Sequence, residues 1–350
     1  MTEAYYWIDT SDKAIWKDHL SRLPSEYSDV YFEPDYCSLY ENKSSKINCF
    51  IYTSRRQVFL YPFLMQEIAQ APGYYDISTP YGYGGHVYNS SNSDFLKHAL
   101  CKFYEEAKKR NVIAELIKFH PLLGNHKAVE SIFPGKIDCM CSTVYVDLDI
   151  DEENRWKNMY THANRKCINK AIRSNTKIEF TQHSLHWESF KRLYELTLMN
   201  NNAAAFYCFS ESYYQKIKTS LTKNYVLASA MLENKIVATL LLLLGTHFTH
   251  CHLIGSDRNY MSAGINNLLH HEVILWSKQN GYSKLHIGGG RTNDEDDSLL
   301  KFKKSFSNKK SLLYVGEYIL DQLKYDQVID NWLSGYPKNK DTTRLLRYRA

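Results

Sequence analysis

The chain has 350 residues, of which 44% are hydrophobic and 23% are charged, so it is not a disordered chain and can build two domains. Its formal net charge of +5 is small but unevenly spread. Residues 301–350 carry eleven Lys and Arg against five acids, and residues 155–177 carry seven with no acid. Two local basic patches fit an anionic ligand better than an evenly spread positive charge would.

Cysteines and apolar runs exclude several classes of protein. The eight cysteines include no C-x-x-C pair, and Cys139 with Cys141 is too little for a zinc site, so we expect reduced thiols and no metal. The first 20 residues are charged throughout, unlike a signal peptide. The longest apolar run, 236–245, is half the length of a membrane span and predicts a buried strand. We therefore expect a cytoplasmic protein with no transmembrane segment.

The first part of the chain predicts short strands and one long helix. A turn at 54–56 joins the first two strands as a hairpin. A loop rich in Gly, Pro and Tyr follows at 72–88, and an amphipathic helix spans 93–110. The strands are predicted at 48–53, 57–63, 114–119 and 144–148.

The second part predicts helix, strand, two helices, three antiparallel strands, helix and strand. A short helix near Leu299 and a last strand at 312–319 complete the order, which is typical of an α+β fold. The longer helices are predicted at 151–175, 186–199, 211–221 and 264–280. The strands are predicted at 178–181, 225–232, 235–244, 248–254 and 284–287.

The sharpest motif runs from Gly288 to Phe306, GGGRTNDEDDSLLKFKKSF. Three glycines let the backbone approach a ligand or turn tightly, and Asp297 or Ser298 can cap the short helix. On that helix Lys303 shares a face with apolar residues, so its ammonium would be partly desolvated and would stabilise a developing oxyanion. The alternative is an ordinary amphipathic helix with solvated lysines.

A second motif, DISTPYGYGGHVYN, runs from Asp76 to Asn89 beside five clustered tyrosines. Glycines such as Gly84 give a ligand access to the backbone, and Tyr81 and Tyr83 supply rings for stacking and hydroxyls for hydrogen bonds. This combination suits a sugar or a nucleotide-sugar. The alternative is a tyrosine-rich structural loop. Asp76 is a candidate for orienting an amine.

Three further segments carry weaker signals. Lys166 shares one side of a helix with two other basic residues, and Arg165 lies at its edge; such a strip holds phosphates or is a solvated face. Tyr207, in NNNAAAFYCF, would line a pocket or only pack. Arg258 and Gly264 precede a helix N-terminus, which favours an anion; the family resemblance described below implies a pyrophosphate at this position.

Four of these motifs together resemble the FemABX-like branch of the GNAT acyltransferase superfamily, over nearly the whole chain. The resemblance implies an α+β fold of two tandem GNAT-like domains with mainly antiparallel central sheets. It places the first domain at 1–145 plus 317–350 and the second at 146–316. The motifs are TPYGYGG at 79–85, FHPLLGN at 119–125, NRKCINKA at 164–171 and GGG with DSLLKFKKSF at 288–306.

The resemblance also implies transfer of an acyl or aminoacyl group to an amine of a peptidoglycan or envelope-polysaccharide precursor. The donor would be aminoacyl-tRNA or acyl-CoA, with no tightly bound cofactor. By motif, Lys303 matches the lysine that stabilises the transition state and contacts the donor, and Phe302 is its neighbour. Arg165 would hold phosphates of a nucleotide-sugar or lipid-linked precursor, in peripheral contact with the inner membrane face.

The chain departs from the family at one loop. Where the peptidoglycan enzymes carry R-G-P-V-x-D, this sequence reads GGHVYN, so His86 replaces proline and Asn89 replaces the acid. By position, Gly84 and Asn89 are still candidates for contact with the substrate. This weakens a muramyl peptide as acceptor and leaves room for an amino-sugar precursor. Two alternatives stay open: an acetyl-CoA-dependent N-acetyltransferase, and a module that binds glycan precursors without catalysis.

Overall fold

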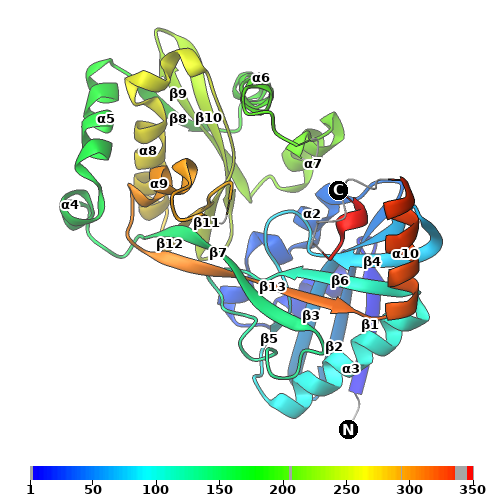
Figure 1. The fold of residues 1–350 in the computed structure, drawn as a ribbon. Coiled ribbons are helices and arrows are strands. Elements are labelled where there is room, and N and C mark those ends of the chain that lie inside the picture. Colours follow the sequence, from blue (N-terminus) through cyan, green and yellow to red (C-terminus); the bar gives the residue numbers. More distant parts are fainter. Residues whose placement is uncertain (1–2, 205–206, 293, 336–344, 350) are drawn as a thin grey trace. The chain divides into compact units, whose positions relative to one another are not determined.

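The computed structural model describes residues 3–204, 207–292, 294–335 and 345–349 (Figure 1). The chain divides into two compact units: unit 1 comprises residues 1–140 and 312–350, and unit 2 comprises residues 141–311. The boundaries predicted at 145 and 316 lie five residues from these positions. They differ because two strands, β7 (Lys136–Asp147) and β13 (Lys310–Ile319), each run through a boundary.

The sheet of unit 1 has the strand order β1-β2-β3-β4-β6-β13. All neighbours are antiparallel except β4 and β6, which are parallel. The predicted hairpin is confirmed, with Arg55 in the left-handed region at its turn (φ 57°). The strands are β1 (Glu3–Asp9), β2 (Ser45–Ser54), β3 (Gln57–Ile68), β4 (Ala71–Ser78) and β6 (Val112–Lys118), and a short β5 (Val87–Tyr88) pairs with β3.

Helices cover both faces of this sheet. Helix α3 (Ser93–Lys109) packs on the core that contains Val112, whereas α10 (Gln322–Gly335) packs on the core that contains Ile113. Since adjacent strand residues point to opposite faces, these two helices lie on opposite faces of β6. Helices α1 (Lys13–Leu20) and α2 (Pro34–Cys37) lie between β1 and β2 in the chain.

The elements of unit 1 that the sequence missed include β1, α1, α2, β4 and α10. The segment predicted as a loop from 72 to 88 begins as strand β4, because Ile77 pairs with Met65 and fills the core under α3. Helix α10 was not predicted at all. Its buried positions, Tyr325, Val328, Ile329 and Trp332, have the i, i+3, i+4, i+7 spacing of an amphipathic helix, so the periodicity was present in the sequence and was overlooked.

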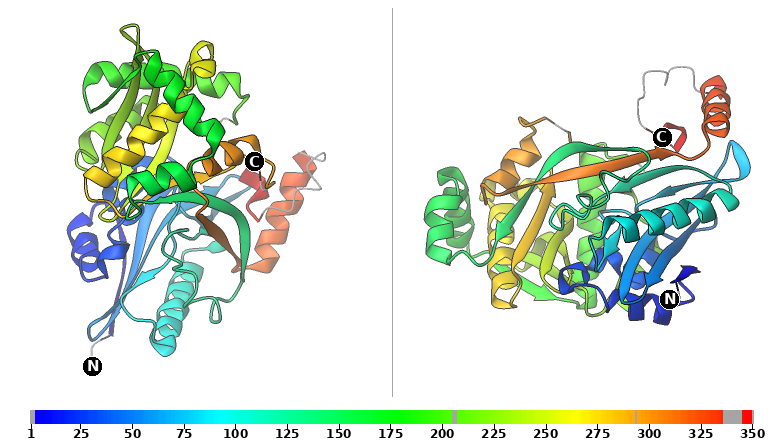
Figure 2. Two further views of the ribbon diagram at one scale, coloured as in Figure 1. Left: turned by 90° about the vertical axis from the view of Figure 1, so that its left-hand side faces the viewer. Right: turned by 90° about the horizontal axis from the view of Figure 1, so that it is seen from below.

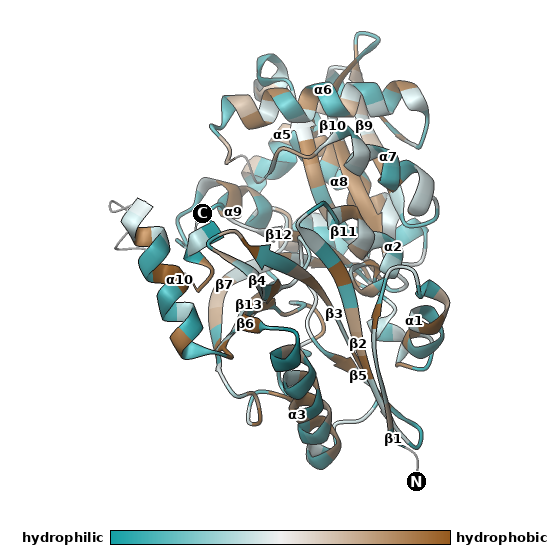
Figure 3. Cartoon of the chain, turned by 90° about the vertical axis from the view of Figure 1, so that its right-hand side faces the viewer, coloured by the Kyte–Doolittle hydropathy of each residue, from teal (hydrophilic) through white to brown (hydrophobic). Residues whose placement is uncertain are grey.

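The sheet of unit 2 has the order β7-β12-β11-β10-β9-β8. The predicted three-strand meander is confirmed as β9 (Tyr225–Leu232), β10 (Lys235–Leu244) and β11 (Phe248–Ser256), with β8 (Lys177–Thr181) antiparallel to β9. Strand β12 (Lys284–Gly289) is antiparallel to β7 and parallel to β11. In Figure 3 the brown, hydrophobic residues include β10, the apolar run of the sequence.

Unit 2 is also covered on both faces. Helices α5 (His162–Arg173) and α8 (Ile265–Gln279) pack together over the core that contains Leu240 and Leu242 (Figure 2). Helix α6 (Ser184–Asn200), followed by α7 (Glu211–Ser220), packs on β10 and β11 from the other face. Gly255 of β11 shows how closely α6 approaches, because a Cβ there would lie 2.4 Å from the backbone nitrogen of Tyr194.

The single helix predicted at 151–175 is wrong. The structure has α4 (Glu152–Asn154), a π-helical turn at Arg155–Met159, and then α5. The break falls where Thr161 caps α5 by accepting the N–H of Asn164 at 3.3 Å. Among the described residues, no helix is long and apolar enough to cross a membrane.

Candidate active site

Two parallel strands of unit 2 pair over a short stretch and then stop pairing. Strands β11 and β12 are in register only from Phe248 to His250, opposite Lys284 to His286. Both strands continue beyond this point, to Ser256 and Gly289. On its other side β12 has an irregular register against β7 between His286 and Gly288. The two strands therefore diverge beyond His250 and His286, and we call this region the strand split. The glycine motif begins on β12, at one side of the split.

A short helix places a lysine at this split. Helix α9 (Ser298–Lys304) begins at Asp297, whose Oδ1 accepts the N–H of Leu300 at 2.9 Å. The Nζ atom of Lys303 donates to the carbonyl oxygen of Gly289 at 2.7 Å. Gly288 has φ +91°, and a Cβ there would lie 3.1 Å from that Nζ atom. The glycines thus leave room for the ammonium beside the end of β12.

Phe302 anchors the helix next to Lys303. Its ring lies against the ring of His270 on α8, with centroids 5.1 Å apart, and against Phe306 at 5.3 Å. Phe306 is fully buried. Phe302 therefore fixes the orientation of α9 by packing, which is a positioning role for a residue predicted as catalytic.

The environment of Lys303 differs from that of its neighbours on α9. Burial lowers the pKa of Lys303 to about 8. Lys301 forms an ion pair with Asp296 at 2.9 Å, and Lys304 forms one with Glu295. Among the residues that the structure describes, Lys303 has no such ion pair. A half-buried ammonium held by one carbonyl retains donors for a developing negative charge, and low polarity strengthens that interaction.

One side chain near Lys303 was not identified from the sequence. The thiol of Cys251, on β11, interacts electrostatically with Lys303, and burial raises its pKa to about 12. A thiol with such a high pKa is not a nucleophile at neutral pH. Cys251 lies just beyond the last paired residue of β11, so only the three-dimensional register reveals it.

The tyrosine motif of unit 1 forms an aromatic cluster. The ring of Tyr83 packs edge-on against Tyr31 at 5.5 Å, and the carbonyl of Tyr81 accepts the hydroxyl of Tyr36 at 2.6 Å. Both predicted tyrosines are half-buried. Gly82 has φ +100°, and a Cβ there would lie 2.4 Å from the Tyr31 ring. The glycine therefore makes room for a tyrosine ring, and Tyr81 and Tyr83 keep partly exposed surfaces that suit a sugar.

The structure assigns Gly84, Asn89 and Asp76 to internal contacts. Gly84 is buried and donates its N–H to Lys118 O at 2.9 Å. The Oδ1 atom of Asn89 accepts the N–H of Val58 at 2.8 Å, and its Nδ2 donates to Arg56 O at 2.9 Å. These bonds correct the prediction that Gly84 and Asn89 face a substrate.

Asp76 is likewise corrected as a candidate for orienting an amine. Its carboxylate is fully buried on β4, and its Oδ2 accepts from Nε of Arg349 at 2.7 Å. Burial raises the pKa of Asp76, while the Arg349 guanidinium acts in the opposite direction. The carboxylate is paired within unit 1 and is not exposed to an acceptor.

The basic helix is only partly available to a ligand. Arg165 donates through Nη1 to Tyr160 O at 2.6 Å and Trp156 O at 3.0 Å, which closes the break between α4 and α5. These bonds all use Nη1, and the role of Arg165 as a phosphate ligand stays a prediction. Lys170 donates to Ser262 O at 2.8 Å. Lys166 is exposed on α5 and remains a candidate.

The loop after β11 is folded on itself. Residues Arg258–Ala263 form a 3₁₀ helix in which the N–H of Tyr260 bonds to Asp257 O and that of Gly264 bonds to Met261 O. Gly264 has φ +79°, and a Cβ there would lie 2.2 Å from Cys167 O on α5. This contact shows that Gly264 packs closely against α5, and its role as a pyrophosphate ligand stays a prediction. Arg258 is exposed.

Tyr207 lies in a segment beside residues 205 and 206, which are outside the described residues. Its side chain is 40% exposed, and its carbonyl accepts the hydroxyl of Tyr194 at 3.1 Å. The structure therefore places Tyr207 at the surface of unit 2, where its role in substrate binding stays a prediction.

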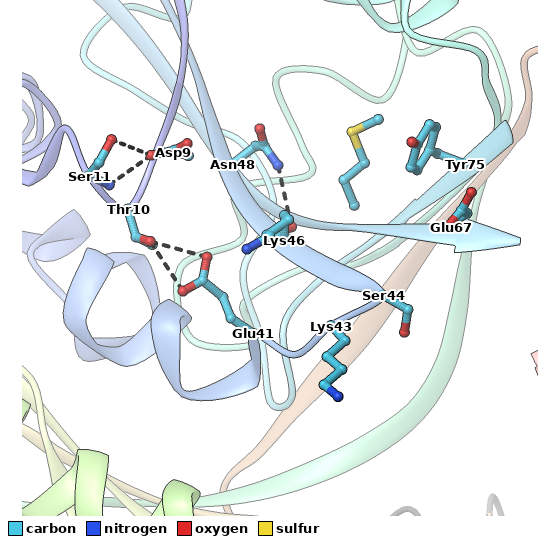
Figure 4. A pocket seen from close by; sticks show the side chains of 11 residues that line it. Asp9, Thr10, Ser11, Glu41, Lys43, Ser44, Lys46, Asn48, Glu67 and Tyr75 are labelled. Carbon is cyan, nitrogen blue, oxygen red and sulfur yellow. Dashed lines mark hydrogen bonds between the residues drawn. The ribbon is translucent and has the colours of Figure 1, made fainter. Parts of the chain in front are cut away.

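Unit 1 also carries a polar hollow of about 560 Å³ (Figure 4). Its groups pair with one another: Glu41 accepts from Thr10 Oγ1 at 3.1 Å, and Asp9 accepts from Ser11. Lysines and acids are mixed along its wall. This hollow has no set of convergent groups comparable to the surroundings of Lys303, and we do not assign the chemistry to it.

Comparison with known proteins identifies the fold. Residues 163–303, which end at Lys303, match the acetyltransferase (GNAT) domain family. The structure of FemX is similar to this chain with a TM-score of 0.72 and 13% identity, over 93% of this chain and 99% of that chain. The chain therefore has a GNAT-like fold that is similar to that of FemX. The family resemblance and the α+β tandem GNAT fold expected from the sequence are thus confirmed.

Two further solved structures share this fold. The C-terminal domain of a putative lysylphosphatidylglycerol synthetase from Agrobacterium fabrum is similar with a TM-score of 0.57 and 14% identity, over 91% of this chain and 94% of that chain. A tandem GNAT protein from the clavulanic acid biosynthesis pathway is similar with a TM-score of 0.52 and 8% identity, over 91% of this chain and 99% of that chain. No curated protein sequence matches the chain.

Proposed function

We propose that this protein transfers an acyl or aminoacyl group from an ester or thioester donor to an amine of a peptidoglycan or envelope-polysaccharide precursor. The observation that carries the proposal is the ammonium of Lys303, which is half-buried at the strand split and bonded to Gly289 O at 2.7 Å. The GNAT domain match over residues 163–303 and the FemX-like fold support an acyltransferase.

The chemistry assigns one role to Lys303. The acceptor amine attacks the donor carbonyl, a C–N bond forms and the C–O or C–S bond breaks. The amine loses a proton, and the leaving oxygen or sulfur gains one. Lys303 donates a hydrogen bond to the carbonyl oxygen as its negative charge develops, which contributes about 3 to 4 kcal/mol in comparable sites. Since the pKa of Lys303 is about 8, this stabilisation declines as the pH rises through 8.

The acceptor is proposed from the fold and the aromatic cluster of unit 1. The FemABX-like resemblance implies an envelope precursor, and one similar structure is named as a putative lysylphosphatidylglycerol synthetase. Tyr81 and Tyr83 would contact a sugar ring through their half-exposed surfaces. Work on a nucleotide-sugar or lipid-linked precursor would place the protein in the cytoplasm, at or near the inner membrane face.

The second candidate is an acetyl-CoA-dependent N-acetyltransferase of an amino-sugar. The match to the acetyltransferase (GNAT) family favours it. The folded loop after β11 argues against binding of a pyrophosphate by backbone N–H groups, because the N–H groups of Tyr260 and Gly264 already donate within the loop. Because these two observations point in opposite directions, the proposed donor is either aminoacyl-tRNA or acyl-CoA, and either would bind transiently.

Mass spectrometry of nucleotide-sugar and lipid-linked precursors tests the proposal. Cells with the wild-type protein should contain a precursor that carries an added acyl or aminoacyl group. Cells without the protein, or with Lys303→Met, should lack that mass increment. The Lys301→Met variant, which changes the neighbouring ion-paired lysine, should retain it. Identical precursors in all four strains would contradict a transferase role and favour a module that only binds precursors.

A further inference from the structure

The first hairpin of unit 1 carries two consecutive arginines at its turn. Arg55 and Arg56 lie between Ser54, the last residue of β2, and Gln57, the first residue of β3, and these two residues are paired. Ser54 also pairs with Glu3, so the turn lies beside the start of β1 (Figure 1). Both arginine side chains are exposed. The sheet of unit 1 therefore ends here in two positive charges.

A hollow of about 330 Å³ adjoins this turn. That volume lies at the lower end of the range of about 300 to 1,000 Å³ for small-ligand sites. No acidic residue among those that the structure describes lines this hollow. The residues that line it are Arg22, Thr53, Arg55, Arg56, Val58 and Asn89. Positive charge thus dominates the hollow, which favours an anion.

The two arginines of the turn account for this charge. The guanidinium of Arg22 forms an exposed i,i+4 ion pair with Asp18, so we leave Arg22 out of the site. The hydroxyl of Thr53 donates to a backbone carbonyl of β1 at 3.3 Å. The attraction for an anion is therefore assigned to Arg55 and Arg56.

Arg55 occupies a backbone conformation that arginine rarely adopts. Its φ of 57° lies in the left-handed region, where Gly, Asn and Asp are the usual residues of a two-residue hairpin turn. An asparagine at this position would form the turn with less strain. Local propensity thus does not explain the arginine, and such conflicts between residue type and backbone concentrate at functional sites.

The segment after β5 holds the turn in place. The Nδ2 atom of Asn89 donates to Arg56 O at 2.9 Å, and Nε2 of Gln57 donates to Ser90 Oγ at 2.6 Å. The N–H of Val58 donates to Asn89 Oδ1 at 2.8 Å. An aspartate at position 89 could not donate to Arg56 O and would add a negative charge beside the hollow. These bonds fix the turn without engaging the guanidinium groups, and a preorganised site loses less entropy when a ligand binds.

We propose that Arg55 and Arg56 bind a phosphate group in this hollow. The planar guanidinium of arginine offers paired N–H donors that match the oxygens of a phosphate, and each such bond is charge-assisted. The phosphate belongs either to the headgroup of an anionic phospholipid or to a soluble phosphate compound. The site lies within unit 1 and does not depend on the transfer reaction proposed for Lys303 of unit 2.

Binding of two phosphate probes to the full-length protein tests this site. Phosphatidylcholine vesicles with and without phosphatidylglycerol are compared by sedimentation, and inorganic phosphate is titrated by calorimetry. The wild type should bind the phosphatidylglycerol vesicles or inorganic phosphate, and the Arg55→Gln/Arg56→Gln variant should weaken that binding at least about tenfold. The probe that binds identifies the source of the phosphate.

The matched control removes the same charge elsewhere in unit 1. Lys108→Gln/Lys109→Gln changes two adjacent exposed lysines at the end of α3 and should bind the probe as the wild type does. Equal weakening in both double variants would show that net charge alone attracts the probe and would overturn the site. Unchanged affinity in Arg55→Gln/Arg56→Gln, or a wild type that binds neither probe, would also overturn it.

Single variants separate phosphate binding from folding and from catalysis. Arg55→Asn loses the guanidinium but tolerates the left-handed region, so its melting temperature should be at least that of the wild type while its affinity falls. Arg56→Lys, which keeps the charge but loses the fork, should give an intermediate loss. Full affinity in Arg55→Asn would contradict the proposed role of Arg55. Lys303→Met should bind the probe as the wild type does, so the site can be tested even if the proposed transfer is wrong.

Discussion

Each unit contains one charged side chain that the sequence predicts to take part in the reaction, and the two side chains differ in their burial and in their bonding partners. In unit 1, Asp76 is fully buried and paired with Arg349 at 2.7 Å. In unit 2, Lys303 is half-buried and bonded only to the carbonyl of Gly289 among the described residues. A buried carboxylate paired with a guanidinium stabilises the fold, whereas an ammonium held by a carbonyl keeps donors for chemistry.

The pairing of Asp76 predicts the largest effect on stability. Arg349→Met leaves a buried carboxylate without its partner, so the free energy of unfolding should fall by about 3 kcal/mol. Urea denaturation measures this change. The matched control is Arg22→Met, which removes an exposed i,i+4 pair with Asp18 and should cost less than about 0.5 kcal/mol. Transfer per folded molecule should not change in either variant, and a selective loss of transfer in Arg349→Met would return Asp76 to the active site.

A second buried acid of unit 1 should make stability depend on pH. Glu115 accepts the hydroxyl of Tyr104 at 2.8 Å, and burial raises its pKa from 4.5 to about 7. The folded state therefore holds a proton that the unfolded state loses above pH 4.5. The free energy of unfolding should decline by about 2 to 3 kcal/mol as the pH rises from 5 to 7.

Glu115→Gln should remove this decline. Its control is Glu106→Gln, because the pKa of Glu106 is lowered to about 2 by Lys109 and Arg110, so the stability it provides is lost only as the pH falls below 4.5. That variant should keep the slope between pH 5 and 7. Equal slopes in the wild type and Glu115→Gln would show that Glu115 is ionised in the fold.

The packing of Gly264 distinguishes structure from ligand binding in unit 2. Gly264→Ala would place a Cβ 2.2 Å from Cys167 O at φ +79°, whereas Gly281→Ala has a similar φ of +82° and no atom within 4 Å. Both variants share the backbone strain of about 1 kcal/mol. Thermal denaturation should show Gly264→Ala to be less stable than Gly281→Ala by about a further 2 kcal/mol. Equal stabilities of the two variants would mean that the close approach of Cys167 O to Gly264 does not constrain the residue at position 264.

The smallest effect is expected at the neighbour of Lys303. Lys301→Gln breaks an exposed ion pair with Asp296, so stability should change by less than about 0.5 kcal/mol. Denaturation midpoints and transfer rates check this together. A large fall in the transfer rate of Lys301→Gln would mean that several lysines of α9 contribute to the reaction and that the role is not specific to Lys303.

Local pattern predicted most of the fold. The hairpin of β2 and β3, helix α3 and the meander β9 to β11 were found, because apolar periodicity and turn residues lie within each segment. The break between α4 and α5 was missed, because Arg165 stabilises it through the carbonyls of Trp156 and Tyr160, which is a tertiary contact without a sequence period.

The candidate site was predicted only in part. Lys303 was singled out from the sequence because its apolar neighbours on α9 and the glycines before it are close in sequence, and its role stays a prediction. Asp76 was misjudged because its partner, Arg349, lies 273 residues away. Arg291 directly follows the three glycines, but the sequence could not show that it and Arg258 both donate to Oδ1 of Asn201, because these residues meet only in the fold.

The turnover of the Lys303→Met variant tests the central claim most directly. Purified wild type, Lys303→Met and Lys301→Met are compared with the donor and acceptor that precursor analysis identifies, and melting checks that each is folded. We predict that the catalytic constant of Lys303→Met falls at least about a hundredfold, while Lys301→Met matches the wild type. An unchanged catalytic constant in folded Lys303→Met would contradict the assignment of the strand split as the active site.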